Sequence, residues 1–138
     1  MRVTVDINVL LDVFQKREPH YAASARILAM VVDGSIFGVF PAHGFTTLYY
    51  LIRKDASKPH AEAAMDEVLG HFQIGNLETA GWGIARHLLM DDFEDAVVAA
   101  VAQATGSSCI ITRNTGDFAK SPVPAFSPLE FLSQWALR

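Results

Sequence analysis

The amino-acid sequence predicts an α/β fold, a three-layer sandwich in which a mostly parallel sheet of four to five strands lies between helices on both faces. Short apolar or β-branched runs recur near residues 4, 38, 73, 110 and 125, as expected of buried strands. Stretches with helical spacing separate these runs, which is typical of parallel strands joined by crossover helices. Because the chain has 138 residues without a repeat or a linker, we expect one domain, residues 1–138.

Composition and charge restrict the class of protein further. The 51% hydrophobic and 19% charged content is that of a compact globular protein and not of a disordered chain. The net charge of -4 predicts no broad basic surface of the kind that captures nucleic acid electrostatically. Nucleic acid is not excluded as a substrate, because acidic clusters that bind divalent cations also lower the net charge of a nuclease.

Cysteine content and hydropathy predict the compartment. Cys109 is the only cysteine, so no internal disulfide is possible and a reducing environment is expected. No apolar run approaches the ~18 residues of a membrane span, and the N-terminus does not read as a signal peptide because Asp6 interrupts it. We therefore expect a cytoplasmic protein that does not act at a membrane.

The first half of the chain alternates strand and helix patterns in order. A strand begins after Met1 and is followed by an apolar helix from Val9 that Pro19 ends. The next expected elements are a helix over residues 21–32, a strand over residues 36–40 stopped by Pro41, and helices over residues 45–54 and 58–69.

The second half repeats the alternation with shorter strands. The expected elements are a short strand over residues 72–74, helices over residues 78–89 and 92–105, a buried strand over residues 109–112, an extended segment over residues 123–126 and a final helix over residues 128–137. Gly81 and Gly83 weaken the prediction of the helix over residues 78–89, since glycine is a poor helix former.

Polar residues follow the first strand directly. Asp6 ends the apolar run and Asn8 comes two residues later. In open α/β sheets ligands bind at the carboxyl ends of the strands, so Asp6 is the first candidate for a functional carboxylate. We expect other polar groups to join it from distant parts of the chain.

A second group of carboxylates precedes the helix over residues 92–105. Asp91, Asp92, Glu94 and Asp95 put four of the fifteen acids into five residues. Capping explains one of them, because Asp92 with Asp95 three residues later resembles a capping box. Metal ligation is the alternative, since oxygen donors suit Mg²⁺ or Mn²⁺ and adjacent carboxylates repel one another without a cation.

The third polar segment follows the strand over residues 109–112. It reads Thr112-Arg113-Asn114-Thr115-Gly116-Asp117, a hydroxyl, a guanidinium, an amide and a carboxylate around a turn. Asn and Asp favour turns by bonding their own backbone, which is the structural explanation. Three segments that each place Asp at the end of a strand or the start of a helix nevertheless predict one cluster at one edge of the sheet.

These three motifs together resemble the PIN-domain family. The resemblance rests on residues 5–10, 92–96 and 111–118, in the right order and over essentially the whole chain. It implies a PIN-like fold and a metal-dependent ribonuclease of the kind found as toxins in toxin-antitoxin pairs. It also implies that Asp6, Asp95 and Asp117 are catalytic residues that bind Mg²⁺ or Mn²⁺, and that Asn8, Thr112 and Asn114 support them. Arg113 is a candidate contact to the scissile phosphate, although a surface ion pair is the more common role of such an arginine.

One departure from the family bears on activity. Family members usually carry Thr-x-x-Glu in the helix after the second strand, whereas Thr47 stands about where that glutamate is expected and no acid occurs from Gly34 to Lys54. Glu94, Asp92 or Asp91 could substitute in space, three carboxylates and the Thr47 hydroxyl could suffice, or activity could be lost. His43 lies just before this position and is a weaker candidate for a ligand or proton carrier.

Other classes of protein fit less well. A haloacid-dehalogenase phosphatase requires a second Asp where this chain has Asn8, glycine-rich nucleotide loops are absent, and the five histidines lack zinc-site spacing. The remaining alternative to the ribonuclease is a catalytically impaired PIN-like module that binds RNA or protein.

Three kinds of partner are expected. The resemblance implies RNA, single-stranded or structured, an antitoxin protein, and a second copy of the chain. Tyr49, Tyr50 and Met65 offer aromatic and apolar surface for a homodimer, although the same residues could belong to the core.

Overall fold

The protein folds around one five-stranded sheet in a computed structural model that describes residues 1–136. The strands are β1 (Arg2–Val5), β2 (Phe37–Pro41), β3 (Gln73–Gly75), β4 (Cys109–Ile111) and β5 (Ala125–Phe126). Their order across the sheet is β3-β2-β1-β4-β5, and all four pairings are parallel. The prediction of an α/β sandwich with a parallel sheet is confirmed.

Seven α-helices and one short 3₁₀ helix connect the strands in the described part of the chain. They are α1 (Ile7–Phe14), α2 (Tyr21–Val32), α3 (His43–Asp55), α4 (Lys58–His71), α5 (Thr79–His87), α6 (Phe93–Ala104), η1 (Thr115–Phe118) and α7 (Pro128–Ala136). None of the helices within residues 1–136 is long and apolar enough to cross a membrane.

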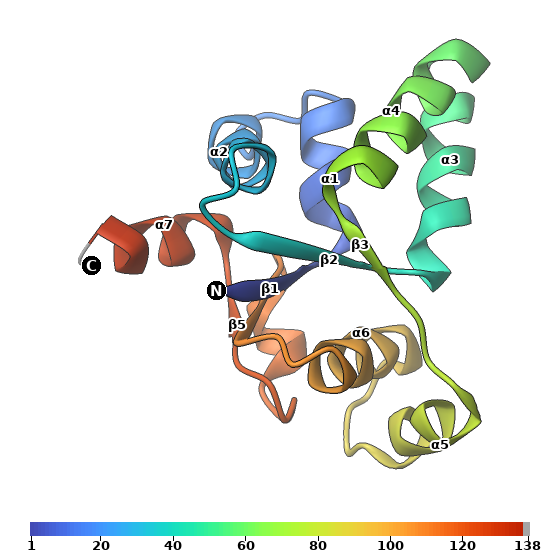
Figure 1. Cartoon of the computed structure of the whole chain (residues 1–138), viewed down its shortest axis with the longest axis vertical. Coiled ribbons are helices and arrows are strands. Elements are labelled where there is room, and N and C mark those ends of the chain that lie inside the picture. Colours follow the sequence, from blue (N-terminus) through green and yellow to red (C-terminus); the bar gives the residue numbers. More distant parts are fainter. Residues whose placement is uncertain (137–138) are drawn as a thin grey trace.

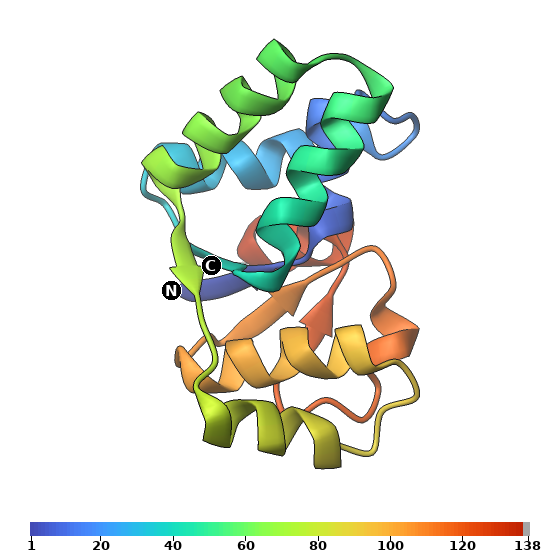
Figure 2. The ribbon, with the colours of Figure 1, turned by 90° about the vertical axis from the view of Figure 1, so that its right-hand side faces the viewer.

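The helices cover both faces of the sheet (Figures 1 and 2). Helices α1, α2, α3, α4 and α7 lie on one face, and α5 and α6 lie on the other. The larger apolar cluster fills the first interface, with Phe40, Leu10 and Ile27 among its buried members. Two smaller clusters pack α6 against the other face of the sheet and include Val98, Val97 and Val101.

Helix α6 approaches the sheet closely because its buried face is made of small residues. Residues 96–102 are all buried and read Ala-Val-Val-Ala-Ala-Val-Ala. Gly75 at the end of β3 leaves the space that this approach needs, since a Cβ there would lie 2.6 Å from Val101 Cγ1 and 2.8 Å from Val39 Cγ1. This packing lets α6 lie close to the sheet.

Several element boundaries differ from those expected. The first helix begins at Ile7 and not at Val9, so Asp6 becomes its N-cap. Pro41 belongs to β2 as its last residue, where it pairs with Gly75 of β3. Helix α3 therefore starts at His43, two residues earlier than predicted.

The later elements are mostly shorter than the patterns indicated. Helix α5 forms despite Gly81 and Gly83 but ends at His87. Strand β5 is limited to Ala125–Phe126, and α7 is described to Ala136, so the predicted helical Leu137 lies outside the described residues.

Candidate active site at the carboxyl edge of the sheet

Asp6 lies at the carboxyl end of β1 and is 6% exposed. Its extended backbone makes it the N-cap of α1, and its Oδ1 accepts a 2.8 Å hydrogen bond from the Ile7 N–H. Its Oδ2 accepts a 2.9 Å hydrogen bond from Thr112 Oγ1, which belongs to the residue directly after β4. Because β1 and β4 are parallel neighbours, their carboxyl ends meet and the two side chains come together.

Burial changes the acidity of Asp6. Desolvation raises its pKa above the usual value, while the hydrogen bonds from Thr112 and Ile7 work in the opposite direction. The charge of Glu94 raises the pKa further and that of His43 lowers it. Hydrogen bonds thus hold the Asp6 carboxylate in place, and it interacts electrostatically with Glu94 of α6 and His43 of α3.

Three of the predicted supporting residues, Asn8, Thr112 and Asn114, take part in a hydrogen-bond network that includes Asp6. Asn8 Nδ2 lies 3.5 Å from Asp6 Oδ2 and 3.4 Å from Thr112 Oγ1, and donates to both. The backbone N–H of Asn114 donates to Thr112 Oγ1 over 3.1 Å. Thr112 is therefore the central residue of a network that links β1, α1 and the segment after β4.

Helix α6 presents its carboxylates at the same edge. Asp92 is the N-cap of this helix, and its Oδ1 accepts a 3.0 Å hydrogen bond from the Asp95 N–H. The capping role of Asp92 is therefore confirmed, and it places Asp95 in the first turn, where a carboxylate faces the positive end of the helix dipole.

Asp95 interacts electrostatically with carboxylates from several segments of the chain. Its pKa is raised to about 6, first by desolvation and then by repulsion from Asp92, Asp6, Asp117 and Glu94. These five acids come from the residue that follows β1, from the N-cap and first turn of α6, and from η1. The structure thus brings the three predicted catalytic residues into one electrostatic cluster.

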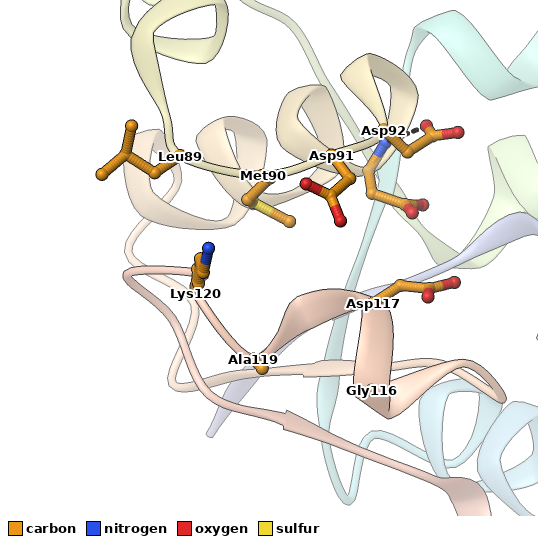
Figure 3. Close-up of a pocket in the computed structure, with 9 residues that line it drawn as sticks. Leu89, Met90, Asp91, Asp92, Gly116, Asp117, Ala119 and Lys120 are labelled. Atoms are coloured by element: carbon orange, nitrogen blue, oxygen red, sulfur yellow. Dashed lines mark hydrogen bonds between the residues drawn. The ribbon is translucent and has the colours of Figure 1, made fainter.

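An open pocket of about 290 Å³ lies beside this cluster and is lined by Asp91, Asp92, Asp95, Asp117 and Lys120, with Leu89, Met90, Gly116 and Ala119 completing the wall. Figure 3 shows Asp91 and Asp92 on the segment that leads into α6 and Asp117 on the opposite wall. Asp117 is held in η1, where its N–H donates to the Asn114 carbonyl over 3.0 Å. The pocket gives solvent and ligands access to Asp95 and Asp117.

A second, smaller recess lies beside Asp6. Asp6, His43 and Glu94 line it together with apolar residues of β2 and α6. The Nδ1 atom of His43 is buried without a hydrogen-bond partner, and desolvation lowers the pKa of this imidazole. Glu94 lines this recess with Asp6, and its charge raises the pKa of Asp6, whereas no acid of α3 is present there.

Thr47 is not brought into the cluster. It is exposed on α3 and lines neither of the two pockets that contain the carboxylates. Arg113 is paired with Asp12, whose Oδ2 lies 2.9 Å from its Nε. The structure therefore gives Arg113 a protein partner, and its contact to a phosphate stays a prediction.

The sequence analysis gave His43 little weight and did not single out Asp12. His43 begins α3, two residues after the end of β2, and it lines the same recess as Asp6. Asp12 was overlooked within the apolar run of α1, where a carboxylate on the buried face was itself the signal, since buried charges require partners.

The carboxylates of the cluster suit a hard divalent cation, because such cations prefer oxygen ligands. A bound cation would also reduce the electrostatic repulsion between the carboxylates. Within residues 1–136, however, no three His, Cys, Asp or Glu side chains already stand close enough together to hold a metal ion. Asp6 is buried and held by hydrogen bonds, whereas Asp95 is partly exposed and Asp117 is exposed.

Comparison with solved structures agrees with this architecture. The chain is similar to VapBC2 of Rickettsia felis bound to a promoter DNA fragment, with a TM-score of 0.71, 16% identity and coverage of 92% of this chain and 98% of that one. A toxin-antitoxin complex from Klebsiella pneumoniae gives a TM-score of 0.68 at 20% identity, with coverage of 91% and 97%. The sarcin-ricin loop cleaving toxin VapC20 of Mycobacterium tuberculosis gives 0.62 at 16% identity, with coverage of 78% and 86%. At these identities the similarity shows the fold.

The family itself is shown by sequence. No curated protein matches the chain significantly. The family model of the PIN domain matches residues 2–116, which include β1 through the start of η1 and therefore Asp6, Asp95 and Thr112. The chain belongs to the PIN-domain family.

Proposed function

We propose that this chain is a metal-dependent ribonuclease that hydrolyses RNA phosphodiester bonds and acts as the toxin of a toxin-antitoxin pair. The observation that carries the proposal is the convergence of Asp6, Asp95 and Asp117 on one edge of the sheet, with Glu94 and Asp92 close enough to raise the pKa of Asp95. Membership of the PIN-domain family supports the same activity.

The roles of the residues follow from their surroundings. Asp6 is the rigid member, because Thr112 and the Ile7 N–H orient both of its oxygens. Asp95 and Asp117 line the open pocket and are the carboxylates that a substrate phosphate would approach. Glu94 is the fourth candidate acid, because its charge acts on Asp6 as well as on Asp95.

The proposed cofactor is Mg²⁺ or Mn²⁺. A bound divalent cation supplies charge stabilisation of the phosphate and acidifies a water. Asp6, Asp95 and Asp117 would hold it, and Asn8, Thr112 and Asn114 would keep Asp6 and the segment before Asp117 in place. The supporting role of Thr47 also stays a prediction, which its exposed position does not favour.

Three partners are proposed with this activity. RNA is the proposed substrate, and the similar structure from Klebsiella pneumoniae, a toxin-antitoxin complex, makes an antitoxin protein the expected regulator. A homodimer would use the exposed Tyr50 and Leu69 of α3 and α4, whereas Met65 is buried in the core. Light scattering that returned the monomer mass of 15.1 kDa would refute the dimer. A cytoplasmic location remains a prediction.

The ribonuclease is tested by cleavage of single-stranded RNA with Mg²⁺ or Mn²⁺, with and without EDTA. We expect cleavage that EDTA stops and that the Asp6→Asn, Asp95→Asn and Asp117→Asn variants lose. Asp66→Asn is the matched control, because Asp66 is an exposed acid on α4 and outside the cluster. Cleavage that survives the three substitutions would contradict the assignment of the site.

A catalytically impaired binding module is the second candidate. It is favoured by the lack of an acid between Gly34 and Lys54 and by the lack of a preformed three-residue metal cluster within residues 1–136. Calorimetry separates the two functions. No heat on titration with Mn²⁺ or Mg²⁺, together with no cleavage and retained RNA binding, would support the binding module.

A further inference from the structure

Asp12 is a fully buried carboxylate that lies outside the cluster described above. It is 0% exposed on α1, one helical turn after Asn8. Its Oδ2 accepts a 3.0 Å hydrogen bond from Ser24 Oγ of α2 and lies 2.9 Å from Arg113 Nε. Its Oδ1 has no hydrogen-bond partner, and the Arg113 Nε–H is not aligned for a hydrogen bond, so the contact with Arg113 is an ion pair.

Arg113 is attached to α1 at two points. Its backbone N–H donates to Asn8 Oδ1 over 3.2 Å, while its side chain pairs with Asp12. Asn8 and Asp12 are four residues apart and therefore share one face of the helix. The helix thus holds both the main chain and the side chain of the residue that follows Thr112.

The segment that Arg113 anchors carries groups of the proposed active site at both ends. Thr112 donates to Asp6 at one end, and Asp117 lines the open pocket at the other. Between them, Asn114 donates to Thr112 Oγ1 and accepts from the Asp117 N–H. The position of Asp117 relative to Asp6 therefore depends on how residues 112–117 are anchored.

A purely structural role is the alternative for this ion pair. Buried ion pairs often contribute little net stability, and apolar residues of similar size commonly replace them without loss. The Asp12–Arg113 pair joins α1 to the segment after β4 and not to another part of the core. Its location therefore favours a role in the geometry of the carboxylates.

We propose that Asp12 is a positioning residue, which through Arg113 fixes residues 112–117 and so sets the separation of Asp117 from Asp6. This inference rests on the proposed function in one respect, namely that the distance between Asp117 and Asp6 determines whether both can hold a divalent cation. The anchoring itself is a property of the metal-free chain and can be measured without activity.

The test compares Asp12→Asn and the double variant Asp12→Asn with Arg113→Gln against the full wild-type chain. The double variant leaves no unpaired charge and so protects against misfolding of the single one. Glu67→Gln is the matched control, because it removes the carboxylate of an ion pair with His71 that lies on α4, away from the site. Circular dichroism verifies that each variant is folded.

Two readouts are required. In the metal-free protein, hydrogen exchange at the amides of Arg113, Asn114 and Asp117 is expected to become at least several-fold faster in the double variant, with no change at core amides of α2. The Mn²⁺ dissociation constant from calorimetry is expected to rise about tenfold, as is usual when a group that orients a ligand is lost. Glu67→Gln should alter neither quantity.

The outcomes separate this inference from the proposed function. Unchanged exchange in folded variants, or faster exchange with an unchanged Mn²⁺ dissociation constant, would overturn the positioning role while leaving the ribonuclease intact. A wild-type chain that binds no Mn²⁺ and cleaves no RNA would instead overturn the proposed function, and the exchange rates alone would then decide whether Asp12 anchors the segment.

Discussion

Thr112 Oγ1 donates a 2.9 Å hydrogen bond to Asp6 Oδ2, across 106 residues of sequence. Both residues are buried, and the bond joins the carboxyl ends of the neighbouring strands β1 and β4. The same hydroxyl accepts from the Asn114 N–H, so one side chain orients the buried carboxylate and begins the segment that carries Asp117.

Replacing Thr112 by Val is expected to lower the free energy of unfolding at pH 7 by about 1.5–3 kcal/mol, because a buried carboxylate loses a donor. Urea denaturation measures the change. Thr112→Ser keeps the hydroxyl and is the control, with a smaller expected loss. A Thr112→Val variant as stable as wild type, together with a less stable Thr112→Ser variant, would show that the methyl group and not the hydrogen bond matters.

The raised pKa of Asp95 predicts how stability depends on pH in the presence of EDTA. Its pKa is about 6 in the folded chain against 3.8 for an unperturbed carboxyl, so the folded state binds the extra proton between these values. The stability that this proton contributes is present below about pH 4 and is lost as the pH rises through 6.

Asp95→Asn removes this titration. Wild type is therefore expected to lose stability relative to Asp95→Asn between pH 4 and pH 6, and to change little relative to it at higher pH. Urea midpoints measured at several pH values give the difference. A difference that is constant from pH 4 to pH 7 would contradict the crowding of carboxylates around Asp95.

The Gly75→Ala variant tests whether close packing at Gly75 determines the distance between α6 and the sheet. In Gly75→Ala the new Cβ would meet Val101 and Val39 at less than 3.0 Å, so we expect a loss of about 1–3 kcal/mol of unfolding free energy. Gly70→Ala on α4 is the control, since nothing lies within 4 Å of a Cβ there and a helical alanine is favoured. Thermal unfolding of both variants should move in opposite directions, and a neutral Gly75→Ala would refute the packing argument.

Binding of Mn²⁺ to the folded chain alone predicts a concentration-dependent stabilisation, of about 2.7 kcal/mol when free metal is 100 times the dissociation constant. Asp117→Asn should reduce this effect, because one of the carboxylates of the cluster is neutralised. Thermal unfolding over a Mn²⁺ series measures it, with Asp66→Asn as the control. An identical response of wild type and Asp117→Asn would remove Asp117 from the proposed ligand set.

Local patterns predicted most of the fold because strand and helix periodicity depends on near neighbours. The five strands were found, and Asp92 was correctly assigned as a cap from its spacing to Asp95. The boundary at the first helix was wrong, since capping by Asp6 starts the helix at Ile7. Pro41 was wrongly expected to lie outside the second strand, because its pairing with Gly75 depends on a strand more than thirty residues away.

By itself the sequence determined the order of strands and helices and the presence of Asp6, Asp95 and Asp117 at their ends, because these follow from short-range patterns. Only the tertiary structure decided that Glu94 and not Thr47 faces Asp6, and that Asp12 holds Arg113. The physical reason is that burial and charge repulsion act between side chains that are close in space, whatever their separation along the chain.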